Sequence, residues 1–265
     1  DIERRVDLVR FAAWLNQGRG ILTISRLFVG NYEDHFAAIP KEEQRIQQRL
    51  EQEAIIAFSE VEVVPTFEEG VIAVAQANGI AGISSNTIMF GWSEKRERLA
   101  STLRIMRVVG RMGKSTLICR VRPRAWTTRP RRIDVWWGGL QHNGDKMLLF
   151  AYLLSVNPDW HGAEICVRSV ATNEMMQQQT RRSLERMLQE SRIDARTEVT
   201  IRPDGTSVQD MIQEQSRDAD IVFLGLRQPE PGTETDYAQR LEELVGNLPT
   251  VVLVRNASQF AGRML

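Results

Sequence analysis

Ile221-Val-Phe-Leu-Gly-Leu226 is a short apolar run that ends near a glycine, and Thr87-Ile-Met-Phe-Gly-Trp92 has the same form. Each run has the length and composition of a buried strand. Each is followed by a charged helical pattern and then by a further apolar run, Thr116-Leu-Ile-Cys119 or Thr250-Val-Val-Leu253. This agreement predicts an internal repeat whose two halves share one order of strands and helices.

Strand and helix patterns alternate outward from these runs along the whole chain. An N-terminal helical pattern, which includes Leu8, Phe11 and Leu15, opens the first half. After it we expect strands at 20–29, 61–64, 87–92 and 116–121, and helices at 40–58, 67–78 and 94–109. In the second half we expect strands at 133–137, 164–170, 197–201, 221–226 and 250–254, and helices at 146–154, 174–189, 207–215 and 237–244. Strands separated by helices predict an α/β fold, with a mostly parallel sheet covered by helices on both faces.

The patterns divide the chain into a first α/β subdomain, 1–126, and a second, 127–265. The second half opens with a strand, whereas the first opens directly with a helix. By the repeat, the first strand of the first half should lie just upstream of Asp1, and its absence would leave a sheet edge uncovered or filled by another chain. The chain also lacks an initiator methionine, so we expect it to be part of a longer protein.

The composition argues against several classes of protein. Lys+Arg and Asp+Glu are both 34, so no net positive charge attracts nucleic acid. No apolar stretch has the length needed to cross a bilayer. Cys119 and Cys166 lie inside apolar runs and are expected to be buried and free in a reducing compartment. The histidines His35, His142 and His161 lie far apart, so no metal site is predicted.

A basic stretch surrounds the prolines in the middle of the chain. We interpret it as a solvated connector, while an acidic lipid or protein patch as its partner stays an alternative. Its members are Arg120, Arg122, Arg124, Arg129, Arg131 and Arg132.

Two glycine-containing segments could be taken for phosphate loops. Gly110-Arg-Met-Gly-Lys-Ser-Thr116 joins a helix to a following strand, which is the wrong direction for a phosphate cradle, so a helix-terminating turn is favoured. Gly138-Gly-Leu-Gln-His-Asn-Gly144 leads from a strand into a helix, where a nucleotide phosphate could be held. Asp145 would repel such an anion, and a structural turn is favoured here too. The sequence contains no recognisable Ser/His/Asp order or activated cysteine, so we do not expect this chain to be an enzyme.

The strand predicted at 133–137 carries three informative side chains. Trp136 and Trp137 are adjacent, so one ring should enter each face of the sheet and pack in the core. Asp134 is an acid in an otherwise apolar strand, so it must reach the end of the sheet or find a backbone or arginine partner.

Arg132-Ile-Asp-Val-Trp-Trp137, followed by a glycine-containing turn and the leucine-rich Met147–Leu154, resembles the C-terminal cytosolic domain of cation-chloride cotransporters, within the amino acid permease superfamily. Asn86-Thr-Ile-Met-Phe-Gly-Trp92 and Gly20-Ile-Leu-Thr-Ile24, with Gly30-Asn-Tyr32, are similar to two further stretches of that family. The residues that match its motifs, here called the signature residues and expected to be structural, are Asn86, Thr87, Gly91, Trp92, Ile133, Asp134, Trp136, Trp137 and Gly144. The chain departs from the family at His142-Asn-Gly-Asp145, where an Asp-Gly-Gly-like turn is usual.

The resemblance implies two tandem units with the fold of universal stress proteins. It also implies a non-catalytic regulatory and dimerisation domain at the cytoplasmic face of the cell membrane. This domain would need no cofactor and would belong to a transporter that moves chloride with sodium and/or potassium. Its expected partners are the transmembrane part of the same polypeptide and a second copy of the chain. No Ser/Thr-rich regulatory insert is present, which suggests a prokaryotic member.

The alternative function is that of a nucleotide-binding sensor like the universal stress proteins. Such sensors are expected to carry Gly-x-x-Gly, with Gly-Ser/Thr about nine residues on, after the fourth strand of each unit. Neither Gly91-Trp-Ser-Glu-Lys95 nor Gly225-Leu-Arg-Gln-Pro229 supplies that loop. ATP binding in that mode is therefore not expected, although a nucleotide or regulatory protein held by other residues stays possible.

Overall fold

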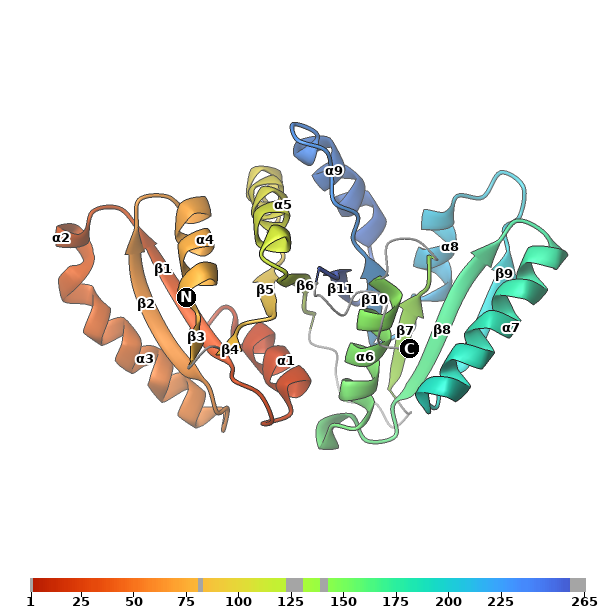
Figure 1. The fold of residues 1–265 in the computed structure, drawn as a ribbon, viewed down its shortest axis with the longest axis horizontal. Coiled ribbons are helices and arrows are strands. Elements are labelled where there is room, and N and C mark those ends of the chain that lie inside the picture. Colours follow the sequence, from red (N-terminus) through yellow and green to blue (C-terminus); the bar gives the residue numbers. More distant parts are fainter. Residues whose placement is uncertain (1, 81–82, 123–130, 139–142, 258–265) are drawn as a thin grey trace.

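The computed structural model describes residues 2–80, 83–122, 131–138 and 143–257 (Figure 1). The boundary predicted between 126 and 127, the connector arginines Arg124 and Arg129, and most of the turn between Gly138 and Gly144 lie outside the described residues. No helix in the described part of the chain is both long and apolar enough to cross a membrane.

The order of elements follows the predicted alternation of helices and strands. The first half contains α1 (Val6–Asn16), β1 (Thr23–Val29), α2 (Tyr32–His35), a 3₁₀ turn (Phe36–Ala38), α3 (Ile39–Gln52), β2 (Phe58–Val64), α4 (Phe67–Ala77), β3 (Gly79–Ile80), β4 (Ile83–Ser84), β5 (Thr87–Gly91), α5 (Arg96–Arg111) and β6 (Ser115–Arg120). The second half contains β7 (Arg132–Trp136), α6 (Asn143–Ser155), a 3₁₀ turn (Pro158–Trp160), β8 (Glu164–Ala171), α7 (Glu174–Ser191), β9 (Arg196–Ile201), α8 (Val208–Gln215), β10 (Ile221–Gly225), α9 (Glu234–Val245) and β11 (Thr250–Arg255).

The main differences from the prediction lie in the first half. The helix expected over 40–58 ends at Gln52, because Ala54 adopts a left-handed backbone conformation with φ of 53° and Phe58 already begins β2. The short helix α2 and the short strands β3 and β4 were not predicted, since runs of two to four residues carry no periodicity.

The largest sheet has seven strands in the order β5-β6-β11-β10-β7-β8-β9. All its neighbouring strands are parallel except β6 and β11, which pair antiparallel with Cys119 opposite Val252. Strands β1 and β2 form a separate parallel pair. The fold is therefore the predicted α/β class with mostly parallel strands, but the antiparallel pairing places strands of both halves in one sheet.

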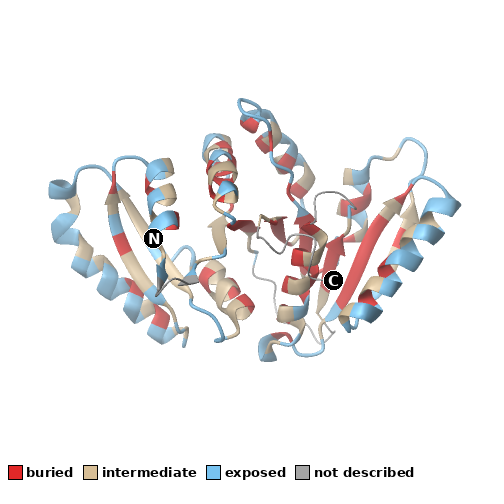
Figure 2. Cartoon of the chain, viewed as in Figure 1, coloured by how far each residue is buried: buried red, intermediate tan, exposed pale blue. Residues whose placement is uncertain are grey.

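Helices cover both faces of the seven-stranded sheet (Figure 1). Phe223 points into a core formed with α1, α6 and α7, while its neighbour Leu224 points into a second core formed with α5, α8 and α9. This alternation along β10 is what a strand buried on both faces requires. Figure 2 shows that the buried strands include those at the centre of the second half, and β6 of the first half is buried as well.

Arg120, at the end of β6, binds the C-terminus of α9 instead of being a solvated part of the connector. Its guanidinium donates to the backbone oxygens of Val245, Gly246 and Leu248 at distances of 2.6–3.1 Å. Burial lowers the pKa of this guanidinium to about 10. The interpretation as a solvated stretch is wrong for this residue, because the carbonyls at a helix end attract a cation. It is wrong for Arg132 as well, because this residue begins β7 and its guanidinium donates to the Gln215 carbonyl at 2.9 Å.

Substitution of Arg120 by alanine is expected to lower the free energy of unfolding by about 2 kcal/mol, because three charge-assisted hydrogen bonds to α9 are lost. Urea denaturation measures this loss. The control is Arg122→Ala, since Arg122 is exposed and bonds Thr250 through its backbone nitrogen, which the substitution keeps. Equal losses in the two variants would contradict the assigned role of Arg120.

Candidate functional site

Asp134, the acid of the signature strand, lies at the centre of a buried polar cluster. Its side chain is 0% exposed and accepts hydrogen bonds from Arg168 Nε at 2.9 Å and from Ser216 Oγ at 2.7 Å. Arg132 Nε lies 3.2 Å from the other carboxylate oxygen, an ion pair too poorly aligned to count as a hydrogen bond. Of the alternatives that the sequence left open for Asp134, namely the end of the sheet, a backbone partner or an arginine partner, the structure shows the arginine partner.

The register of β7 and β8 brings the cluster together. Asp134 lies opposite Cys166, so Arg168, two residues further along β8, is on the same face of the sheet. Ser216 follows the last residue of α8, and Gln215 Oε1 accepts a further bond from Arg168 at 3.3 Å. Arg168 therefore links β7 and β8 to the end of α8.

Further ion pairs connect this cluster to the surface of the protein. Arg168 Nη1 donates to Glu198 Oε2 on β9 at 2.5 Å, and Arg196 lies 2.9 Å from the same carboxylate. Burial raises the pKa of Asp134, while Arg168, the hydrogen bond from Ser216 and Arg132 oppose that rise. The arrangement can stabilise a buried carboxylate, but it presents no exposed nucleophile or open ligand position.

The two tryptophans of the signature strand enter opposite faces, as predicted. Trp136 is buried among the residues of the α5, α8 and α9 core, and its Nε1 donates to Ser216 Oγ at 2.9 Å. Trp137 packs against the other core. A Cβ at Gly144 would lie 2.5 Å from the Trp137 ring, so glycine at 144 lets the first turn of α6 lie on that ring.

The remaining signature residues do not join this cluster. Asn86, Thr87, Gly91 and Trp92 lie along β5, which the sheet order separates from β7 by three strands. The backbone oxygen of Asn86 accepts from Ser115 on β6, and Trp92 is buried. The signature residues therefore occupy two places in the sheet rather than one site.

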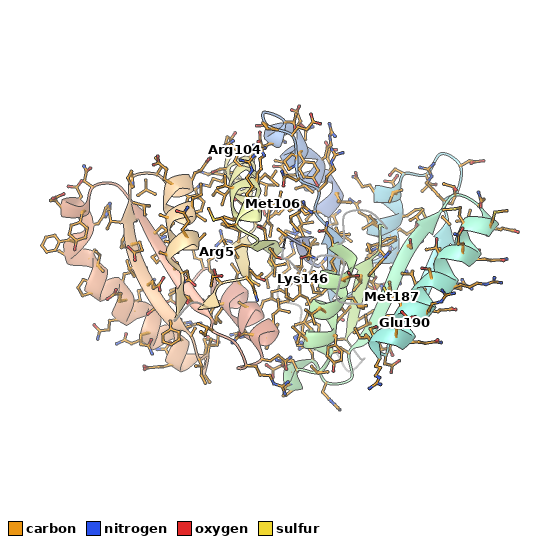
Figure 3. The ribbon with its side chains drawn as sticks, in the orientation of Figure 1. Arg5, Arg104, Met106, Lys146, Met187 and Glu190 are labelled. Atoms are coloured by element: carbon orange, nitrogen blue, oxygen red, sulfur yellow. The ribbon has the colours of Figure 1, made fainter. Side chains whose placement is uncertain are left out.

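The ends of β5 and β10 carry matching contacts that involve residues not predicted from the sequence. Arg5 Nη1 donates to the Trp92 carbonyl at 3.2 Å, and Asn143 Nδ2 donates to the Leu226 carbonyl at 3.1 Å. Asn143 Oδ1 also accepts from the backbone nitrogen of Asn256 at 2.8 Å. Figure 3 shows Arg5 beside the first-half strands. In both halves a side chain near the start of a helix thus closes the end of a strand, β5 in the first half and β10 in the second.

The segment that resembles a phosphate loop around Lys114 is a helix-terminating turn, as predicted. Gly113 has a φ of 74°, and the backbone nitrogen of Lys114 donates to Val109 of α5. The Lys114 ammonium donates to the carbonyl and hydroxyl of Ser85 at 2.6 and 2.8 Å. This lysine is 5% exposed, so it is engaged within the fold and does not reach a surface where a phosphate could bind.

The leucine-rich helix α6 is buried, as predicted, together with its one lysine. Lys146 is 8% exposed, its Nζ lies 5.5 Å from the centre of the Phe150 ring, and burial lowers its pKa (Figure 3). Cys119 and Cys166 are buried free thiols in strands, also as predicted. Among the residues that the structure describes, no three His, Cys, Asp or Glu side chains gather as metal ligands would.

The arrangement of strands and helices is that of the universal stress proteins. A universal stress protein from Archaeoglobus fulgidus DSM 4304 matches with a TM-score of 0.59 at 14% identity, over 92% of this chain and 90% of its own. The cytoplasmic domain of a prokaryotic cation chloride cotransporter matches with a TM-score of 0.68 at 17% identity, over 98% of this chain and 94% of its own. At these identities the likeness shows the fold. No family model matches the chain.

Proposed function

We propose that this chain is the non-catalytic cytosolic regulatory and dimerisation domain of a membrane transporter that moves chloride together with sodium and/or potassium. The observation that carries the proposal is the segment Ile133–Trp137, which covers most of β7 (Arg132–Trp136) and the residue that follows it. Its acid is held by Arg168, and its two tryptophans pack into the two cores, so the motif shared with the cotransporter family serves as the centre of the fold. The likeness to a cotransporter's cytoplasmic domain over nearly the whole chain supports the same proposal.

The polar contacts of the described residues support a role without catalysis. Most buried charges of the described residues are paired within the fold, as in the Asp134 cluster, or are bonded to backbone oxygens, as Lys114 is, while the Lys146 ammonium lies near the Phe150 ring. Burial raises the pKa of the Cys166 thiol, and at Cys119 the rise is larger still, so both side chains stay protonated and poorly nucleophilic. These features suit a domain that acts by its shape and its surface.

The transport proposal can be tested with the gene that carries this chain. We expect that gene to encode apolar segments of bilayer length before Asp1. Cells that express the whole protein should take up rubidium or sodium in a chloride-dependent manner. Deletion of residues 1–265 should lower that uptake while the amount of membrane-inserted protein, measured in parallel, stays comparable. A gene without such segments, or uptake that ignores chloride, would contradict the proposal.

Dimerisation is a separate part of the proposal and has its own measurement. Sedimentation equilibrium of residues 1–265 is expected to show a monomer–dimer equilibrium. A strict monomer at high protein concentration would remove dimerisation from the proposed function and leave the transport part standing.

A nucleotide-binding sensor is the second candidate, and the fold shared with universal stress proteins favours it. The contacts of Asn143 argue against it, because this side chain joins the ends of β10 and β11 beside the start of α6, where nucleotides bind in open α/β sheets. Thermal-shift titration with ATP distinguishes the two candidates. We expect no stabilisation, whereas a ligand at 100 times its dissociation constant would add about 2.7 kcal/mol.

A further inference from the structure

The central strand of the second half has a parallel neighbour on each side. β7 pairs with β8 along one edge and with β10 along the other. It leads into α6, whose Asn143 then closes the end of β10. In the order β9-β8-β7-β10-β11, β7 is therefore the strand that joins the two sides of this half into one sheet.

In the first half the helices and strands follow the same order, but no described strand pairs with both β1 and β5, as β7 pairs with β8 and β10. This place between β1 and β5 is called the open position. Judged by element order, β1 and β5 correspond to β8 and β10. Among the described residues, however, β1 pairs only with β2, and β5 pairs only with β6. Figure 1 shows the β1–β2 pair set apart from β5, and the two belong to different sheets.

The backbone groups at this position are left without a neighbouring strand. The backbone oxygen of Leu22 and the backbone nitrogen of Gly30 are hydrogen-bonded to β2. Because the backbone groups of successive residues in a strand point to opposite edges, those of Ser25 and Leu27 point away from β2. Asn86 and Trp92 bond β6 in the same way, which turns Met89 to the opposite edge of β5. Two strand edges thus present amide and carbonyl groups that no described strand pairs.

Side-chain burial differs between the two halves in the way that a missing central strand would cause. Six of the eight residues of β8 and four of the five residues of β10 are buried. None of the residues of β1 or β5 is buried, although most of them are apolar or β-branched (Figure 2). The strands that flank β7 are covered, and those that flank the open position are not.

The start of α1 indicates where the missing strand would join the chain. Arg5, just before α1, reaches the carbonyl of Trp92 at the end of β5, as Asn143 at the start of α6 reaches Leu226 at the end of β10. In the second half, the strand that leads into this contact is β7. By the same path, the strand that leads into α1 would run beside β5, parallel to it, and end near Arg5.

We propose that the open position between β1 and β5 is filled by an extended apolar segment of this same polypeptide, contributed by residues that precede Asp1. The segment would add as a parallel strand of five to seven residues, the lengths of β5 and β1. It would join the two-stranded and seven-stranded sheets into one. The inference rests on the fold and is independent of the proposed function, because a soluble protein could supply such a strand equally well.

The test compares residues 1–265 with a chain that begins about twelve codons further upstream in the native gene, using amide hydrogen exchange by NMR. In the longer chain, the amides of Ser25, Leu27 and Met89 are expected to exchange at least about ten-fold more slowly. Arg26 and Phe90 are the matched controls, because their amides already face β2 and β6 and should change less. A proline in the middle of the added segment should abolish the protection, since it cannot donate to the ladder.

Three results would overturn the proposal. The first is unchanged exchange of these amides in the longer chain. The second is a start codon within a few residues of Asp1. The third is protection in residues 1–265 that rises with protein concentration, which would make a second copy the occupant. The exchange measurements do not depend on ion transport, so they let the strand and the proposed function fail separately, whereas a start codon near Asp1 would contradict both.

Discussion

Replacement of Arg168 by methionine is expected to lower the free energy of unfolding by about 3–5 kcal/mol, the usual cost of removing one partner from a buried ion pair. Asp134 has no exposed surface, and Arg168 is the strongest of the charged groups that oppose the effect of burial on its pKa. Without Arg168 the carboxylate would keep Ser216 and the poorly aligned Arg132. Urea denaturation of residues 1–265 measures the change.

A matched control separates this buried pair from its exposed neighbour. Arg196 pairs with Glu198 at the same end of the cluster, but its side chain is 59% exposed. Arg196→Met is therefore expected to change the free energy of unfolding by less than about 1 kcal/mol. Comparable losses in the two variants would show that burial of the charge is not what makes Arg168 important.

The loss in Arg168→Met should also depend on pH. Removal of the guanidinium raises the pKa of the buried Asp134 further above its ordinary value of 3.8. The folded variant then binds this proton more tightly than the unfolded chain does, so its stability relative to the parent falls as pH rises and recovers as pH falls. A difference that is the same at about pH 5 and about pH 8 would contradict the account in which a carboxylate is left unpaired.

Truncation of Trp136 to alanine is expected to cost about 3–5 kcal/mol, as large aromatic residues in cores usually do. The ring lies between β7 and the core formed by α5, α8 and α9, and its Nε1 bonds Ser216. The substitution would empty that space and remove a donor from the polar cluster. Thermal and urea unfolding should both report the loss, and a cost below about 1 kcal/mol would contradict the packing described for this ring.

The phenylalanine variant separates volume from hydrogen bonding. Trp136→Phe keeps much of the apolar contact but removes the Nε1 donor, so a loss of about 1 kcal/mol, together with a smaller packing cost, is expected. Ser216 would still donate to Asp134, which limits the damage to the cluster. The alanine variant should therefore be clearly less stable than the phenylalanine variant.

The sequence predicted those parts of the fold that depend on periodicity. The alternation of apolar runs and helical patterns predicted the α/β class, and the adjacency of Trp136 and Trp137 predicted that their rings enter opposite faces. It also predicted that Asp134 needs a partner. These predictions need only local information, namely the periodicity and composition of a single strand or helix.

The partners themselves could not be predicted, because they depend on pairing between distant strands. Arg168 meets Asp134 only through the register in which Cys166 lies opposite Asp134, and Ser216 arrives from the end of a helix. The antiparallel pairing of β6 with β11 likewise has no local sequence pattern. Arg5 and Asn143 were missed for the same reason, since a polar residue near a helix start is common and its target is non-local.

The antiparallel pairing of β6 with β11 also has a mechanical consequence. The two halves share a backbone ladder across their boundary, and α5 packs against α9 over it, so a tilt of one half against the other would strain hydrogen bonds that both halves share. Protein interiors are dense and transmit displacement with little compression. A displacement of β9 at one edge would therefore be transmitted through the strand ladder to β5 at the other edge of the seven-stranded sheet.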